Sequence, residues 1–291
     1  MIFAIPFPDI SPVLIEIPLG FTTLPIRWYA LAYIVGIWLG YLLARRTISR
    51  AALWRDDTPP LSPARLEEFL TWLILGIILG GRLGYVAAYG EGQFLDDPMA
   101  VFRVWEGGMA FHGGFLGVTV AGLAFCWKHK LPLAGMADVL ALGTPPGLFL
   151  GRIANFINAE LWGRPTELPW GVIFPGRAAQ DCPGVEGLCA RHPSQLYEAG
   201  LEGLALGALL IWLAYARGWL KRPGMIAGLF IAGYGLSRFI VEFFRQADAQ
   251  FMTPDNPLGH VIRFGEAGIT RGQQLSLPMI LAGLLILALA L

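Results

Sequence analysis

The chain has 291 residues, of which 55% are hydrophobic and only 14% are charged. Charged residues make up about a quarter of an ordinary soluble protein, so this composition excludes a typical cytosolic enzyme. The length alone would suit two soluble domains, but long apolar runs recur at fairly regular intervals. We therefore predict one polytopic membrane domain over residues 1–291.

Seven apolar runs are each long enough to cross a bilayer, whose core of about 30 Å needs roughly 20 mostly apolar residues per helix. The runs are 24–44, 69–90, 109–127, 134–157, 194–216, 223–246 and 273–291. They predict an all-α fold with about seven transmembrane helices. The first twenty residues contain no Lys or Arg and so lack the charged start of a cleaved signal peptide. We expect the first helix to remain as an anchor.

Basic residues near helix ends predict the orientation, because Lys and Arg are retained on the cytoplasmic side. The loops after the first, third and fifth helices hold ten basic residues, including every Lys in the chain. These ten are Arg45, Arg46, Arg50, Arg55, Arg65, Lys128, Lys130, Arg217, Lys221 and Arg222. The N-terminus is therefore predicted outside and the C-terminus inside.

Four arginines fall within the predicted spans: Arg82, Arg152, Arg238 and Arg245. An Arg near the centre of a bilayer costs on the order of 2.5 to 3.5 kcal/mol on insertion scales, so such residues indicate function. The alternative is that each lies close enough to a helix end for its charge to reach the interface, and Arg245 is the residue that best fits this alternative.

The sixth run carries a narrow polar stripe. Tyr234, Arg238, Glu242 and Arg245 are spaced four, four and three residues apart, so they share one face of a helix. Glu242 can partly neutralise either Arg, which leaves a net positive surface suited to an anion. The alternative is an ion pair that joins helices without binding a ligand.

Polar residues also gather at the end of the fourth run. Arg152, Asn155 and Asn158 can present a guanidinium group and two amides to phosphate or glycerol oxygens, with Glu160 and Gly163 close behind. Glycine at position 163 would allow a close approach of the backbone.

His112 enters the third helix between aromatic residues and glycines, where a satisfied core histidine is the alternative to a catalytic one. Because successive helices alternate in direction, the polar residues of six helices fall toward the outer half of the membrane. They are Tyr29, Arg82, His112, residues 152–160, His192 and residues 238–245. This shared depth predicts one cavity that opens to the outer leaflet.

Residues 158–193 are too many for a simple turn and are rich in Pro and Gly, so they predict a small external cap. Cys182 and Cys189 lie in this cap, and the sequence leaves open whether they form a disulfide. For His192 we expect local hydrogen bonding rather than catalysis, with Ser194 capping the next helical turn. Cys126 is interpreted as a packing residue.

Taken together, the motifs resemble the prolipoprotein diacylglyceryl transferase family over nearly the whole chain. The run GRIANFINAE followed by LWG is similar to the family signature, and RWYA, GGRLGYV, WEGGMAFHGG, RHPSQLYE and YGLSRFIVEFFRQAD follow the family order. The resemblance implies a seven-helix enzyme of the bacterial inner membrane with its active cavity toward the periplasm. Its important residues would be Tyr29, His112, Arg152, Asn155, Glu160, Gly163, Tyr234, Arg238, Glu242 and Arg245.

The implied reaction moves the diacylglyceryl group of phosphatidylglycerol onto the lipobox cysteine thiol of a preprolipoprotein, with glycerol-1-phosphate as the leaving product. A thiol with a pKa near 8.5 needs a base, and His112 is the candidate. Arg152 and Arg238 would hold the departing phosphate, with Tyr29 also assigned to the catalytic set. The lipid-binding set adds Asn158 and Arg82.

The expected partners are phosphatidylglycerol, the signal peptide of a preprolipoprotein and the lipid bilayer. We expect no nucleic-acid partner, no metal and no cofactor. The main alternative function is a transporter or flippase for an anionic lipid, which would also line a cavity with arginines. A purely structural membrane scaffold does not account for the shared depth of the polar residues.

Overall fold

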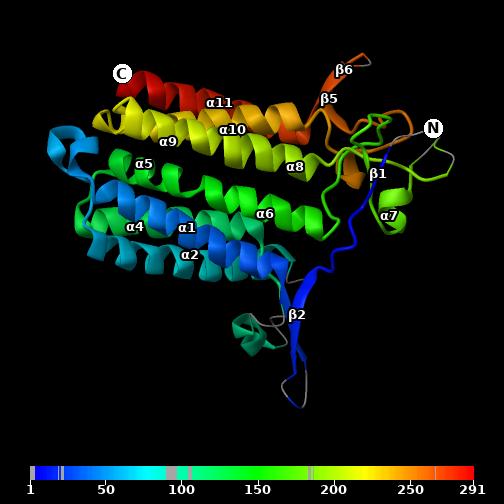
Figure 1. Ribbon diagram of the computed structural model, residues 1–291, viewed down its shortest axis with the longest axis horizontal. Helices are drawn as coiled ribbons and strands as arrows, with labels where there is room; N and C mark the ends of the chain where they lie inside the picture. The colour runs from blue at the N-terminus through cyan, green and yellow to red at the C-terminus, as the bar shows by residue number, and fades with distance from the viewer. Residues whose placement is uncertain are drawn as a thin grey trace. The chain divides into compact units, whose positions relative to one another are not determined.

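The computed structural model describes residues 4–18, 20, 23–89, 97–103, 107–182, 185, 187–265 and 267–291. Its internal contacts divide the chain into two compact units. The larger unit comprises Met1–Ala44 and Asp138–Leu291, and the smaller unit comprises Arg45–Ala137. Helices dominate both units (Figure 1).

A helix occupies each of the seven predicted runs. The main helices are α1 Trp28–Ile48, α2 Pro63–Tyr89, α4 Phe111–His129, α5 Leu133–Gly143, α6 Pro145–Ile157, α8 Ser194–Glu198, α9 Leu206–Ala216, α10 Met225–Val241 and α11 Arg271–Ala290. A π-helix, η5 Ala199–Ala205, joins α8 to α9.

In the described part of the chain, five helical segments are long and apolar enough to cross a membrane: Trp28–Ile48, Pro63–Ala88, Leu133–Ile157, Ser194–Ala216 and Arg271–Ala290. The apolar helix α10 is shorter, with 17 residues. The chain is thus a mostly helical polytopic membrane protein, and the count of seven spans stays a prediction.

Several predicted helix ends are displaced by a few residues, and two of these differences have a local reason. The first helix begins at Trp28 rather than at residue 24, because Thr23–Arg27 forms strand β3. The sixth run was predicted to continue to residue 246, but α10 ends at Val241 and the chain continues as turns.

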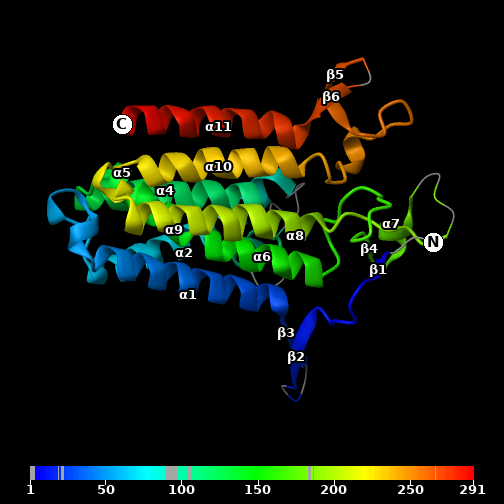
Figure 2. The same ribbon diagram turned by 45° about the horizontal axis from the view of Figure 1, so that its top comes forward.

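Three two-stranded sheets also depart from the all-α expectation. The strands β2 Val13–Pro18 and β3 pair antiparallel, and β3 runs directly into α1 (Figure 2). The strands β5 His260–Phe264 and β6 Ala267–Thr270 form a second antiparallel pair, immediately before α11. In the third sheet β1 Ile5–Pro6 lies parallel to β4 Val172–Ile173, which ties the N-terminal segment to the predicted cap.

In the smaller unit, α2 and α4 approach each other through glycines. A Cβ on Gly84 would lie 2.6 Å from the Cα of Gly113, and a Cβ on Gly80 would lie 2.7 Å from the Cα of Gly117. Small residues four positions apart allow the two backbones to come this close, and dispersion contacts then replace those made with lipid. The glycines therefore determine the packing of this helix pair.

The larger unit uses close helix contacts in the same way. The helices α10 and α11 lie side by side, in orange and red in Figures 1 and 2. A Cβ on Gly203 of η5 would lie 2.6 Å from the Cβ of Phe149 on α6, and one on Gly207 of α9 would lie 2.8 Å from the Cβ of Pro145. These contacts bring α6 against the α8–η5–α9 segment, and both segments carry buried charges.

The α4 glycines offer a matched pair of substitutions. Gly117→Ala places a methyl group 2.9 Å from the Cα of Gly80, so we expect a loss of about 1 to 3 kcal/mol through overpacking. At Gly122 the nearest atoms lie 3.8 Å away, so Gly122→Ala should be neutral or stabilising by up to about 1 kcal/mol. Thermal unfolding of both variants in detergent checks this, and equal melting temperatures would contradict the packing role of Gly117.

Candidate functional site

Six charged side chains, three buried glutamates and three partly buried arginines, form one network in the larger unit, which we call the arginine–glutamate network. Its members are Arg152 on α6, Glu198 on α8, Glu202 on η5, Arg238 on α10, Glu242 at the C-terminal cap of α10, and Arg245. The side chain of Glu198 is 1% exposed and that of Glu202 is 0% exposed. Three helical segments, α6, α8–η5 and α10, therefore direct charged residues to one place.

Glu198 lies at the centre of the network. One of its oxygens, Oε1, pairs with Nη1 of Arg238 and lies 3.7 Å from Nη1 of Arg245. The other oxygen, Oε2, lies 3.1 Å from Nε of Arg152. A single carboxylate thus contacts all three guanidinium groups, which would otherwise repel one another.

Glu242 is held on both sides. Its Oε1 lies 2.5 Å from Nη2 of Arg238 and 3.8 Å from Nε of Arg245, so the ion pairs predicted along the α10 stripe are confirmed. Its Oε2 accepts a hydrogen bond of 2.9 Å from the hydroxyl of Thr270, the residue that caps α11. A Cβ at Gly272 would collide with this carboxylate, so glycine lets Glu242 keep its present position.

Glu202 is paired least well. Its Oε2 lies 3.7 Å from Nη2 of Arg152, and neither of its oxygens has a hydrogen-bond partner among the described residues. It lies in the π-helix η5, a distortion that often marks functional sites. A fully buried carboxylate without hydrogen bonds is costly, so its retention indicates a role beyond packing.

The network contains three arginines and three glutamates, so it is neutral when all six groups are ionised. The expected net positive surface is therefore wrong, because Glu198 and Glu202 were not considered. The signal was present in the sequence, since both acids lie within the apolar run 194–216 and intramembrane acids are costly.

Asn155 and Asn158 both pair with Glu160, a contact that was not predicted from the sequence. Their side-chain nitrogens donate to Oε1 of Glu160, at 2.7 Å and 3.3 Å respectively. Gln195 on α8 donates to the backbone oxygen of Glu160 at 2.5 Å. Oδ1 of Asn158 and Oε1 of Gln195 are buried without a partner among the described residues, so acceptor groups remain for a ligand.

Gly163 connects the network to the predicted cap. It forms a β-bridge with Arg245, and its backbone nitrogen donates to the oxygen of His192 at 2.8 Å. A Cβ at this position would lie 2.7 Å from the Cβ of His192. The glycine therefore permits the close backbone approach that the sequence predicted, and it fixes the chain at Arg245.

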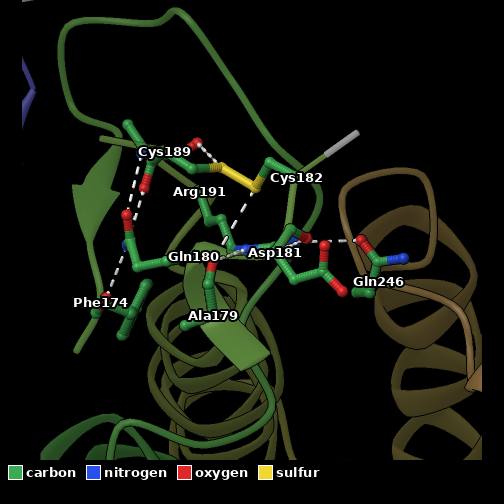
Figure 3. Close-up of a disulfide and its surroundings, with 10 residues drawn as sticks. Phe174, Ala179, Gln180, Asp181, Cys182, Cys189, Arg191 and Gln246 are labelled. Atoms are coloured by element: carbon green, nitrogen blue, oxygen red, sulfur yellow. Dashed lines mark hydrogen bonds between the residues drawn. A yellow bond between two sulfur atoms is a disulfide. The ribbon is translucent and has the colours of Figure 1, made fainter. Parts of the chain in front are cut away.

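The cap is organised by a disulfide between Cys182 and Cys189 and by the buried Arg191 (Figure 3). Arg191 donates to the oxygens of Ala179 at 2.5 Å, Asp181 at 2.8 Å and Gly163 at 3.2 Å. It also donates to Oε1 of Gln246 at 3.1 Å, which links the cap to the residue after Arg245.

His192 and Ser194 have local roles. Burial, together with the nearby Arg164 guanidinium, lowers the pKa of the His192 imidazole, and Nδ1 lies 3.1 Å from the hydroxyl of Tyr197. The predicted hydrogen bonding of His192 is confirmed. The predicted cap by Ser194 is wrong, because its hydroxyl donates to the oxygen of Leu161 at 2.9 Å.

The two predicted tyrosines, Tyr234 and Tyr29, have different neighbours. Tyr234 on α10 lies beside Arg152 and Glu202, as its place in the stripe predicted. Tyr29 at the start of α1 places its hydroxyl 3.1 Å from that of Tyr33. Tyr33, which was not predicted, is the residue that interacts electrostatically with Arg152 and Glu160.

Arg82 and His112 belong to the smaller unit. Arg82 is buried, and its guanidinium donates to the backbone oxygens of Ala100 at 2.5 Å, Val101 at 2.8 Å and Gly107 at 2.6 Å. This arrangement favours holding the loop before α4 over binding lipid. His112 is exposed in the first turn of α4, and Trp105 and Glu106 of the same motif lie outside the described residues.

Chemically, the arginine–glutamate network suits an exchange of anions. Each guanidinium group now faces carboxylates, and a phosphate offers the same planar pair of oxygens to a guanidinium fork. A phosphate that enters the network can therefore replace carboxylates without a new class of contact.

Comparison with known proteins gives the same family over nearly the whole chain. A family model described as prolipoprotein diacylglyceryl transferase matches residues 12–289. The chain is similar to the phosphatidylglycerol–prolipoprotein diacylglyceryl transferase of Roseobacter denitrificans, with 62% identity over 284 residues, 98% of this chain and 97% of the relative. The proteins of the same name from Ruegeria pomeroyi and Sinorhizobium medicae are 62% identical over 278 residues and 48% identical over 282 residues. These cover 96% of this chain, and 94% and 92% of the relatives.

The disulfide yields a prediction about the cap. Replacing Cys182 and Cys189 by serine reopens a short loop, which costs about 2 kcal/mol by loop-closure entropy. The amides of Val172 and Arg191, which bond each other's oxygens at 2.9 Å, should then exchange hydrogen about 30-fold faster. Cys126→Ser, in the smaller unit, is the control and should leave both rates unchanged. Equal protection in the double variant would show that the disulfide does not stabilise the cap.

Proposed function

Since this chain belongs to the prolipoprotein diacylglyceryl transferase family, we propose that its arginine–glutamate network binds the phosphate of phosphatidylglycerol while His112 activates the acceptor thiol. The chain is a transferase that moves the diacylglyceryl group from phosphatidylglycerol to a prolipoprotein. The single observation that supports the phosphate assignment is the contact of one buried glutamate, Glu198, with three arginines.

The acceptor atom in this proposal is the thiol sulfur of the lipobox cysteine in a preprolipoprotein signal peptide. Its thiolate attacks the glycerol carbon that bears the phosphate. A sulfur–carbon bond forms, the carbon–oxygen bond breaks, and its electron pair stays on the departing glycerol-1-phosphate. Negative charge therefore grows on the phosphate as the reaction proceeds.

Arg152 and Arg238 act on that developing charge. Both are preorganised by Glu198, which lies 3.1 Å from Nε of Arg152 and is paired with Arg238, so little reorganisation is needed when charge appears. Tyr234, Glu242 and Arg245 complete the phosphate side of the lipid site.

On the glycerol side of the lipid we place Asn155, Asn158, Glu160 and Gly163. Oδ1 of Asn158 is buried and has no hydrogen-bond partner among the residues that the structure describes, so we assign it as an acceptor for a lipid hydroxyl. Tyr29 is kept in the catalytic set because its hydroxyl pairs with Tyr33, which interacts with Arg152 and Glu160. Arg82 is assigned to holding its loop.

His112 is the proposed base because histidine is the side chain that most often accepts a proton in general base catalysis. The cysteine thiol, with an ordinary pKa near 8.5, is a weak nucleophile until it is deprotonated. Exposure of His112 leaves its ring accessible to a peptide.

The proposed setting is the bacterial inner membrane, crossed seven times, with the N-terminus outside and the cap of residues 158–193 in the periplasm. The ten basic residues in the loops after the first, third and fifth helices support this orientation. The disulfide of the cap agrees with an oxidising compartment.

The direct test uses the purified protein in detergent with phosphatidylglycerol and a lipobox peptide. We expect the peptide mass to increase by one diacylglyceryl group, which a transporter would not produce. Arg238→Gln should lower the transfer rate by about 10²- to 10³-fold, because one preorganised donor to the phosphate is lost. Arg222→Gln, in a predicted cytoplasmic loop, is the matched control and should retain the rate. No mass increase with the wild-type protein would contradict the transferase assignment.

His112 requires a separate test that distinguishes chemistry from binding. His112→Ala should bind phosphatidylglycerol with unchanged affinity and lose transfer by about 10²- to 10⁴-fold, as expected when a general base is removed. Binding is measured by lipid titration and transfer by peptide mass. Transfer at the wild-type rate would remove His112 from the mechanism.

A further inference from the structure

We propose that Glu202 takes up one proton when phosphatidylglycerol binds, so that the arginine–glutamate network accepts the lipid phosphate without gaining net charge. The inference rests on the proposed function and adds a positioning role for a residue outside the predicted site. It follows from the charge balance of the network and from the contacts of its three glutamates.

The charge balance creates the need for a proton. Three arginines and three glutamates cancel when all are ionised, and a phosphodiester brings one more negative charge. The glutamates of the network are almost completely shielded from water, with side-chain exposures of 1% for Glu198, 0% for Glu202 and 7% for Glu242. A buried excess charge is expensive, and proton uptake by a carboxylate removes it.

Glu202 is the glutamate best suited to accept that proton. Glu198 contacts three arginines, and Glu242 has Arg238 at 2.5 Å and the Thr270 hydroxyl at 2.9 Å. By contrast, the ion pair of Glu202 with Arg152 is 3.7 Å long. Its two buried oxygens have no hydrogen-bond partner in the described part of the chain. Protonation of Glu202 therefore disrupts fewer ion pairs and hydrogen bonds than protonation of Glu198 or Glu242.

The position of Arg152 couples the proton to the lipid. Its guanidinium lies between Glu198, at 3.1 Å, and Glu202, at 3.7 Å. When Arg152 turns toward a phosphate, Glu202 loses its cation and would be left as a bare buried anion. The other groups that face Glu202 are Glu198 on α8, Tyr234 and Arg238 on α10, and Arg245 beyond it.

Product release would return the proton. When the carbon–oxygen bond breaks, its electron pair remains on the phosphate, which becomes more basic and accepts the proton from Glu202. Glu202 is then ionised again and can re-form its pair with Arg152, which weakens the hold on the product. The thiol proton leaves separately through the base, so one proton enters and one departs in each turnover.

The test is titration calorimetry of the full-length protein in detergent with phosphatidylglycerol, repeated in buffers of different ionisation enthalpy. The wild-type protein should take up about one proton per lipid. Its affinity for phosphatidylglycerol should therefore fall by about tenfold for each unit of increasing pH, over the range in which free Glu202 is ionised and bound Glu202 is protonated. Glu202→Gln should take up no proton and bind with an affinity that does not vary with pH. Glu16→Gln, on the exposed strand β2, is the control and should behave as the wild type.

Infrared difference spectra identify the group directly. Lipid binding should add the carbonyl band of a protonated carboxylic acid in the wild-type protein and in Glu202→Asp, but not in Glu202→Gln. Lipid binding by the wild type without proton uptake would overturn the inference and leave the proposed function intact, even if Glu202→Gln fails to fold. Proton uptake that persists in Glu202→Gln would assign it to another group and also overturn it. Binding that is unchanged in Arg152→Gln and Arg238→Gln would instead contradict the proposed function.

Discussion

The contact of one glutamate with three arginines holds the functional part of this membrane protein together. Glu198 pairs with Arg238 on α10 and Arg152 on α6, and it also faces Arg245 beyond α10. Removing any partner would leave a charge buried without compensation, which typically costs several kcal/mol. A well-packed apolar cluster would be at least as stable, so stability does not explain the network. We infer that its role is functional: it holds largely buried arginines in fixed orientations, in which a phosphate can replace a carboxylate.

The surrounding structure fixes the positions of the charged residues in the network. Glycines allow α6 to approach η5 and α9, and Asp138 on α5 accepts hydrogen bonds from the backbone nitrogens of Gly224 and Ala227 at the start of α10. At the other end, the cap reaches Arg245 through the β-bridge from Gly163, and Arg191 joins the same cap to Gln246. The network is therefore fixed both by helix packing and by a disulfide-bonded segment.

Helical periodicity and the cost of charge in a bilayer made part of the structure predictable from the sequence. The seven apolar runs and the stripe of Tyr234, Arg238 and Glu242 are of this kind. Pairing between distant segments was missed, because Glu198 and Glu202 meet Arg152 only through the folded helix packing. The pairing of Asn155 with Glu160 was missed for a backbone reason, since the left-handed conformation of Ala159, with φ of 52°, turns Glu160 back toward Asn155. Strand β3 was missed because the apolar residues just before Trp28 appeared to continue the helix.

The proposed transferase binds its lipid by exchanging anions within a buried and neutral network, with a proton at Glu202 to preserve neutrality. The central claim concerns the place of the phosphate. A structure determined with phosphatidylglycerol bound tests this most directly. We expect the phosphate oxygens within hydrogen-bond distance of Arg152 and Arg238, with the Arg152–Glu202 pair separated beyond its present 3.7 Å. A phosphate bound elsewhere, with the six-charge network unchanged, would contradict the claim.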